Sequence, residues 1–131
     1  MVEESRTPTP RELAILKMLW ELGPSSVRDV HRSLLQDESI GKELAYNTVQ
    51  TLLRIMEDKG LVQHHLDGRS FIYTSRFSRD ESARRFLDRV FDGAASQFVS
   101  CLLRAESIPD EELDRMQAMI REARRARGGR P

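Results

Sequence analysis

The sequence predicts a mainly helical protein in which three short helices are followed by a β-hairpin and then by further helices. Two observations predict this order. Apolar residues recur at helical spacing in three segments before residue 60 and again after residue 78. Between these parts, around Asp67–Gly68, the pattern changes to two short runs of β-forming residues joined by a two-residue turn signal.

The composition limits the class of protein. The 131 residues are 39% hydrophobic and 32% charged, which fits a folded protein of one domain or of a small domain with an appendage. No apolar run approaches the roughly 18 residues of a membrane span, and the N-terminal segment lacks the apolar stretch of a secretory signal. A single cysteine excludes an internal disulfide framework. We therefore expect a cytoplasmic protein with no membrane partner.

The first helix is expected to begin at Thr9. Thr9 and Glu12 have the spacing of a capping box, and Pro10 occupies the first helical position. Gly23 and Pro24 end this helix. Its buried face is predicted to consist of Leu13, Leu16, Leu19 and Trp20.

The second helix is expected to begin after Ser25 or Ser26, because either serine can cap it. Its apolar residues repeat at helical spacing: Val27, Val30, Leu34 and Leu35. A polar connection containing one glycine then leads to a third helix, predicted over residues 45–60 and ended by Gly60.

The third predicted helix has an unusual polar face. Its apolar side consists of Val49, Leu52, Leu53 and Met56. The opposite side carries Asn47, Gln50, Thr51, Arg54 and Asp58. Ordinary solvated faces favour Lys and Glu, which form helices better than Asn and Thr do. Taken alone, this face fits an ordinary surface helix. The order of the surrounding elements has to decide whether it is a solvated face or a binding face.

The hairpin is predicted to pair residues 61–66 with residues 70–74, with Asp67–Gly68 as its turn. His64 and His65 are adjacent within the first strand. Adjacent strand residues point to opposite faces, so these two histidines cannot bind one ion together. We therefore predict no metal site.

The segment after Ser78 is predicted to form three more helices. Ser78 and Glu81 repeat the capping-box pattern, Gly93 marks a break, and Pro109 opens a last helix with acidic residues first and basic residues last. About 45 residues in three helices cannot easily build a separate core, so we expect a homodimer. The residues expected at its interface are Phe86, Val90, Phe98, Val99, Leu102, Leu103, Leu113, Met116 and Ile120. Cys101 lies among these residues and is expected to be a buried small hydrophobe.

Three helices followed by a hairpin is the order of a winged helix-turn-helix. The helix over residues 45–60 then occupies the recognition position, because Asn and Gln can pair with adenine edges and a Thr methyl can meet a thymine methyl. The residues expected to contact double-stranded DNA are Tyr46, Asn47, Thr48, Gln50, Thr51, Arg54 and Arg69. No arrangement of residues suited to catalysis or to binding a cofactor is present, so we predict neither an enzyme nor a cofactor.

The charge balance constrains the DNA-binding hypothesis. The chain has 21 basic and 21 acidic residues, so affinity must come from local charge placement and from two copies acting together. A two-fold dimer places its recognition helices roughly 34–36 Å apart, which requires a pseudo-palindromic operator. The alternative is a winged-helix module that binds a protein and not DNA, an interpretation that the zero net charge favours.

These predictions divide the chain into four segments. They are a flexible N-terminus (residues 1–8), a winged helix-turn-helix (9–77), a helical dimerisation region (78–126) and a disordered tail (127–131).

Four segments also carry a resemblance to a known family: "TPRELAILKMLWELGPSSVRDVH", "AYNTVQTLLRIMEDKGLV", "DGRSFIYT" and "IPDEELDRMQAMI". Over about Thr9 to Ala126, the chain resembles the penicillinase repressor group, the BlaI/MecI-type transcriptional repressors. The resemblance implies a dimer that represses by binding inverted repeats, often built around TACA/TGTA elements. It also implies that the polar face of the third helix lies on the DNA and that the last three helices dimerise.

The resemblance raises the question of how repression ends. In β-lactam-responsive members, a sensor-linked protease pathway cleaves the repressor in the dimerisation region at an Asn-Phe bond. The alignment places Cys101–Leu102 at that position, so the cleavage region is matched but the Asn-Phe bond is not. Copper-responsive members carry a C-terminal cluster of cysteines, whereas this chain has one. The inducing signal is therefore open.

Overall fold

The computed structural model describes residues 7–38, 40–105 and 107–128. The chain forms two compact units that divide between Ala83 and Arg84, inside helix α5 (Arg79–Phe91). The sequence analysis placed the boundary before this helix. The assignment of the two parts to DNA binding and to dimerisation stays a prediction.

The predicted terminal segments are described only in part. Residues 1–6 and 129–131 lie outside the described residues. Residues 127 and 128 belong to the last helix, α7 (Asp110–Gly128), which extends two residues beyond its predicted end.

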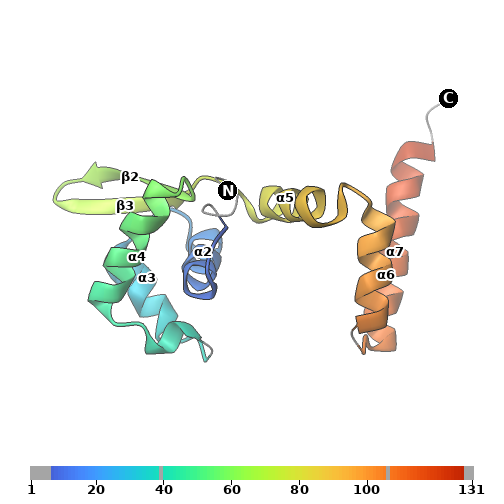
Figure 1. The fold of residues 1–131 in the computed structure, drawn as a ribbon, viewed down its shortest axis with the longest axis horizontal. Coiled ribbons are helices and arrows are strands. Elements are labelled where there is room, and N and C mark those ends of the chain that lie inside the picture. The colour runs from blue at the N-terminus through green and yellow to red at the C-terminus, as the bar shows by residue number, and fades with distance from the viewer. Residues whose placement is uncertain (1–6, 39, 106, 129–131) are drawn as a thin grey trace. The chain divides into compact units, whose positions relative to one another are not determined.

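The first unit has the predicted winged helix-turn-helix fold (Figure 1). Its helices are α2 (Pro10–Leu22), α3 (Val27–Leu34) and α4 (Tyr46–Asp58), with a 3-10 helix, η1 (Ile40–Glu43), before α4. Its strands are β1 (Ser25–Ser26), β2 (Val62–Asp67) and β3 (Ser70–Ser75). The strands form one antiparallel sheet in the order β1-β3-β2. The mainly helical fold class predicted from the sequence is confirmed.

The helix starts follow the predicted capping chemistry. The Thr9 hydroxyl accepts a hydrogen bond from the Glu12 N–H at 3.2 Å, and the Glu12 carboxylate accepts one from the Thr9 N–H at 2.9 Å. Ser26, not Ser25, caps α3 in the same reciprocal way. Ser78 and Glu81 form the matching pair at the start of α5. Side-chain caps satisfy backbone N–H groups that a helix leaves unpaired at its start.

The strand β1 was not predicted from the sequence. It has only two residues, which pair with β3 in the register Ser25↔Tyr73 and Ser26↔Ile72. This pairing joins the residue that caps α3 to the base of the hairpin. The start of α3 is therefore held beside the strand that leads to the wing.

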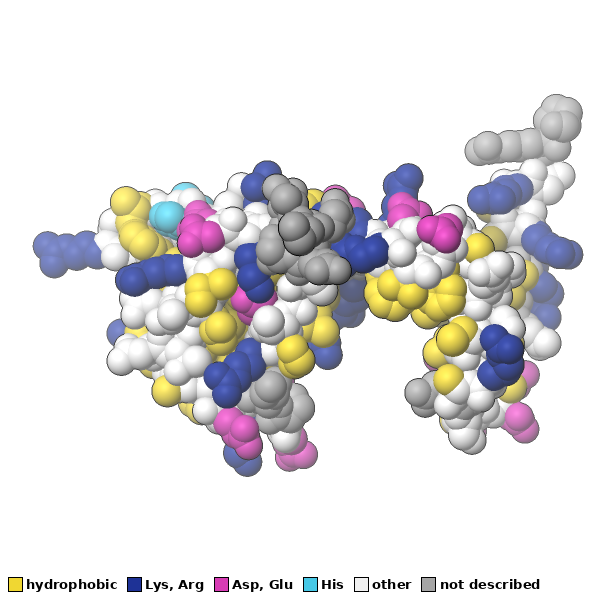
Figure 2. All heavy atoms as spheres, in the orientation of Figure 1, with side chains coloured by type: hydrophobic (Ala, Val, Ile, Leu, Met, Phe, Trp, Pro, Cys, Tyr) yellow, Lys and Arg dark blue, Asp and Glu magenta, His cyan; other side chains and the backbone are white. Residues whose placement is uncertain are grey.

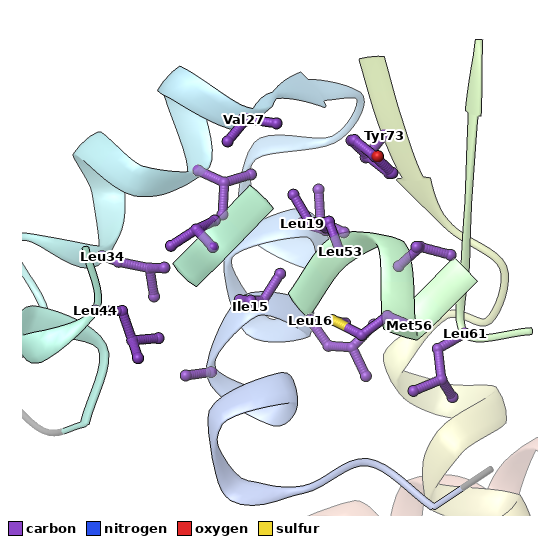
Figure 3. Close-up of a cluster of buried hydrophobic side chains, with 14 residues drawn as sticks. Ile15, Leu16, Leu19, Val27, Leu34, Leu44, Leu53, Met56, Leu61 and Tyr73 are labelled. Carbon is purple, nitrogen blue, oxygen red and sulfur yellow. The ribbon is translucent and has the colours of Figure 1, made fainter. Parts of the chain in front are cut away.

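One hydrophobic core joins the three helices and the base of the hairpin (Figure 3). Ile15 of α2, Leu53 of α4 and Tyr73 of β3 have at most 1% of their surface exposed. The predicted buried face of the first helix is correct in part: Leu16 and Leu19 are buried, whereas Leu13 and Trp20 are half-buried. Leu35, which continued the apolar spacing of the second predicted helix, is 47% exposed because α3 ends at Leu34.

A buried ion pair connects the start of α2 to the end of α4. The Glu12 side chain is 2% exposed, and its Oε1 lies 2.7 Å from the Lys59 Nζ. Glu12 is also the carboxylate of the α2 capping box. The end of α4 is therefore fixed to α2 by charge as well as by apolar packing.

The second unit contains the rest of α5, together with α6 (Ala95–Ala105) and α7. None of the described residues of these three helices is buried. The rings of Phe86, Phe91 and Phe98 contact one another at centroid distances of 5.4–6.3 Å, yet Phe86 is still 49% exposed. Hydrophobic side chains form a continuous patch on the surface of α5 (Figure 2). As a single chain, this unit has no closed core.

Some of the residues predicted for dimerisation are exposed in the single chain, and the others are half-buried. Phe86, Val90, Phe98, Leu103 and Ile120 are exposed, whereas Val99, Leu102, Leu113 and Met116 are half-buried. Cys101 is exposed, so the expectation of a buried cysteine is wrong for the single chain. Among the described residues, no helix combines the length and the apolar character needed to span a membrane.

Candidate nucleic-acid interface

The helix α4 presents one apolar face and one polar face. Val49, Leu53 and Met56 are fully buried, whereas Asn47, Thr51 and Arg54 are exposed on the opposite side. The N-cap residue is Ala45, whose methyl group cannot accept a hydrogen bond. The N–H groups of the first turn of α4 are therefore left for solvent or for an anionic ligand, which the positive end of the helix dipole attracts.

A groove with a cavity volume of about 670 Å³ lies between the start of α3, the polar face of α4 and the tip of the hairpin. Its charged lining residues are four arginines and one aspartate: Arg28, Arg32, Arg54, Arg69 and Asp29. This local excess of positive charge exists although the chain as a whole has 21 basic and 21 acidic residues. The groove is therefore suited to a polyanion.

The groove is lined by some of the residues predicted to contact DNA and by others that were not predicted. Tyr46, Gln50, Arg54 and Arg69 line it, whereas Asn47, Thr48 and Thr51 do not. Arg28 and Arg32 of α3 were missed by the sequence analysis, which considered only the apolar face of that helix. Their spacing of four residues puts both on one exposed face, and that signal could have found them.

The aromatic residues of the groove differ in burial. Tyr46 is 42% exposed, and its ring meets the His31 ring edge-on at a centroid distance of 5.7 Å. Tyr73 is 1% exposed. Burial raises the pKa of the Tyr73 hydroxyl above its ordinary value of 10.0, the Glu57 carboxylate raises it further, and the Arg54 guanidinium opposes both. Arg54 therefore lies within electrostatic reach of the hairpin as well as on α4.

The turn of the hairpin is one residue later than predicted. Asp67 pairs with Ser70, so Gly68 and Arg69 form the two-residue loop. Gly68 has a φ of 65°, which a type II′ turn requires at its first loop position and which glycine adopts without strain. Arg69 therefore occupies the tip of the wing itself, where its side chain is exposed.

The wing also carries an apolar pair. Leu66 and Phe71 are cross-strand partners and are 63% and 43% exposed. They continue the sheet face that Val62 and Tyr73 bury at the base of the hairpin, because residues two apart on a strand share a face. Phe71 is also part of the groove lining.

The two adjacent histidines have different neighbours, as their position on one strand requires. His64 lies opposite Tyr73 in the strand register, and His65 lies opposite Ile72. Within the described ranges, no group of three His, Cys, Asp or Glu side chains is arranged to hold a metal ion.

Comparison with known proteins identifies the family of this winged helix. The model of a family described as penicillinase repressor matches residues 8–122. The chain belongs to the penicillinase repressor family. Members of this family are DNA-binding transcriptional repressors of the BlaI type and not enzymes.

Relatives within this family match most of the chain. The penicillinase repressor of Bacillus licheniformis is 24% identical over 115 residues, which cover 85% of this chain and 87% of that protein. The transcriptional regulator BlaI of Mycobacterium tuberculosis is 30% identical over 124 residues, which cover 92% and 87%. The solution structure of monomeric Bacillus licheniformis BlaI in complex with the blaP half-operator has a TM-score of 0.47 at 25% identity, covering 57% of this chain and 87% of that one.

Proposed function

We propose that this penicillinase repressor family member is a dimeric, sequence-specific repressor that binds inverted-repeat operators through α4. It acts in the cytoplasm and is released by an inducing signal. The observation that carries this proposal is the groove: four arginines from α3, α4 and the hairpin turn line the same groove as Gln50, in a chain without net charge. The charge needed for DNA is thus concentrated beside the residues that can read bases.

The residues divide into two roles. Asn47, Thr48, Gln50 and Thr51 are proposed to meet base edges in the major groove, since amides and hydroxyls can pair with them. Tyr46 and the four groove arginines are proposed to contact phosphates, which set position but carry no sequence information. The exposed first turn of α4 adds backbone N–H groups to the phosphate contacts.

Dimerisation is proposed to occur through the second unit. Its helices bury no described residue, and exposed Phe, Val, Leu and Ile side chains on such a surface favour association. A second copy also doubles the number of phosphate contacts, which offsets the neutral net charge.

Release is proposed to act on this same unit. A sensor-linked protease is the partner that the family resemblance suggests, with Cys101–Leu102 as the corresponding region. That region lies in the middle of α6, so cleavage there would divide the helix and separate Phe98 from Leu103. The loss of half the α6 surface would weaken the proposed dimer and, with it, operator binding.

A winged-helix module that binds protein and not DNA is the second candidate. The zero net charge of the chain favoured this candidate. The groove weakens that argument, because its lining concentrates four arginines although the chain has no net charge. No retardation of any DNA at about 50 mM salt, where phosphate contacts are strongest, together with a stoichiometric protein partner, would favour this candidate over the repressor.

Gln50→Ala is expected to reduce discrimination between an operator and a scrambled duplex by about 1–3 kcal/mol, because a base edge loses a bidentate partner. Thr51→Ala is expected to act in the same direction. Gln36→Ala is the control, since Gln36 is exposed in the turn that follows α3 and does not line the groove. Equal discrimination by the Gln50 variant and the wild type would remove base reading from this position.

Arg28→Ala and Arg54→Ala are each expected to weaken operator and scrambled DNA alike. Each loses a phosphate contact, so the slope of log affinity against log salt should flatten by about one unit for each protomer on the DNA. The matched control is Arg11→Ala, an exposed arginine on α2 outside the groove. Titrations at several salt concentrations measure the slope, and an unchanged slope for Arg28→Ala would exclude α3 from the interface.

A further inference from the structure

The outer part of the wing has little contact with the core. Val62 is the only buried residue of β2, and the five residues after it are exposed. On β3, only Tyr73 is buried. The strand β1 pairs only with Ile72 and Tyr73 of β3, so the part of the hairpin nearer the turn is two-stranded, and a two-stranded hairpin is at best marginally stable in water. The direction of the outer wing relative to α4 therefore depends on particular side-chain contacts as well as on the pairing with β1.

His64 makes these contacts. Its Nδ1 lies 2.7 Å and 2.8 Å from the two carboxylate oxygens of Glu57 on α4, so an Nδ1–H donates to both. Its ring stacks on Phe71 of β3 at a centroid distance of 4.4 Å and an interplanar angle of 22°. The His64 side chain of β2 is thus hydrogen-bonded to α4 and stacked on a side chain of β3.

The surroundings strengthen this contact. The side chains of His64 and Glu57 are 32% and 31% exposed, so water competes only partly for their hydrogen bond. Phe71, which supports the His64 ring, lines the same groove as Arg54 and Arg69. His64 therefore supports a residue of the groove wall as well as contacting α4.

We propose that Glu57 and His64 are positioning residues that hold the wing at a fixed angle to α4, so that Arg69 and the polar face of α4 engage one duplex together. This inference rests on the proposed function. Phosphates lie at fixed spacing along DNA, so a wing that pivots loses the Arg69 contact or has to be ordered again on binding. Neither residue needs to touch DNA for this role.

The positioning role and a simple charge effect predict opposite changes in DNA affinity when Glu57 is replaced. Glu57 is an anion beside a surface proposed to bind an anion, so its removal should strengthen DNA binding if charge alone matters. The positioning role predicts the opposite. Asp58 is the matched control, because it is the next acidic residue on α4 and is exposed, and because its side chain forms no hydrogen bond or ion pair with the described part of the chain.

The test compares full-length Glu57→Ala and Asp58→Ala on operator DNA. Glu57→Ala is expected to bind about threefold to fivefold more weakly than the wild type, the upper part of the range for losing one exposed ion pair. Asp58→Ala is expected to bind equally or more tightly. Glu57→Gln should recover most of the affinity, because its amide oxygen can accept the Nδ1–H. A Glu57→Ala variant that binds as tightly as Asp58→Ala would overturn the proposal.

A second comparison asks whether the effect passes through the wing. In an Arg69→Ala background, Glu57→Ala is expected to cause no further loss, because the contact that it positions is already absent. Independent losses that simply add would contradict the proposal.

A third measurement needs no DNA. The backbone ¹⁵N relaxation of Gly68 and Arg69 is expected to report greater motion in Glu57→Ala than in Asp58→Ala or the wild type. Equal relaxation in all three would overturn the inference even if operator binding is normal. Failure of the wild type to bind any operator would instead overturn the proposed function, and the relaxation data would still test the wing.

Discussion

Phe98→Asp is expected to convert the protein to a monomer and to lower its operator affinity by about 100-fold to 10,000-fold. Phe98 lies on α6, is 37% exposed and contacts both Phe86 and Phe91. A carboxylate at the centre of this aromatic cluster would have to lose its hydration when a second copy covers the surface. The two recognition helices would then bind half-sites independently. Binding of the first would no longer raise the effective concentration of the second at its half-site.

Ser96→Asp is the control, because it adds the same charge to an exposed position of α6 outside the ring cluster. Phe98 also packs within its own unit, so a second variant separates folding from association. Val90→Asp changes a residue that is 53% exposed and lies outside the ring cluster. Sedimentation measures the oligomeric state. If both Phe98→Asp and Val90→Asp stay dimeric and bind normally, the second unit does not carry the dimer interface.

Lys59→Met is expected to lower the free energy of unfolding of the first unit by about 2–3 kcal/mol. The substitution leaves the Glu12 carboxylate 2% exposed and without its cation at 2.7 Å. Removing one partner of a buried pair costs more than the pair itself contributes, because the remaining charge has lost its water. The 23% exposure of Lys59 keeps the expected value below that of a fully buried pair. Urea unfolding followed by circular dichroism provides the measurement.

The double variant tests the cause of this destabilisation. Glu12→Gln combined with Lys59→Met leaves no buried charge and is expected to be more stable than Lys59→Met alone. Lys17→Met, an exposed lysine on α2, should have little effect. A double variant less stable than the Lys59 single variant would show that an unpaired Glu12 carboxylate is not the cause of the destabilisation by Lys59→Met.

The elements predicted from the sequence were those with local causes. Thr9, Ser26 and Ser78 start helices through bonds to residues three positions away, so the spacing alone reveals them. The polar face of α4 was also local, because helical periodicity separates it from the buried side. The turn around Gly68 was found, although the strand register shifted its centre by one residue.

The parts that were missed depend on contacts between distant segments. β1 has two residues, and only its pairing with β3, nearly fifty positions away, makes it a strand. The carboxylate of buried Glu12 is paired with Lys59, which lies 47 residues later in the chain. The spacing of Arg28 and Arg32 shows that they share one exposed face, but only the fold, which brings α3 beside α4 and the wing, makes them part of the groove. The spacing within one helix does not reveal which other segments lie beside it.

The binding preference of the wild-type protein tests the central proposal most directly. Random duplexes are selected on the full chain at about 150 mM salt, and the stoichiometry on the selected DNA is then measured. We predict inverted repeats whose half-sites are centred about 10 base pairs apart, each duplex binding two protomers. Selected sequences without two-fold symmetry, or no enrichment over the starting pool, would contradict the proposal that this protein is a dimeric operator-binding repressor.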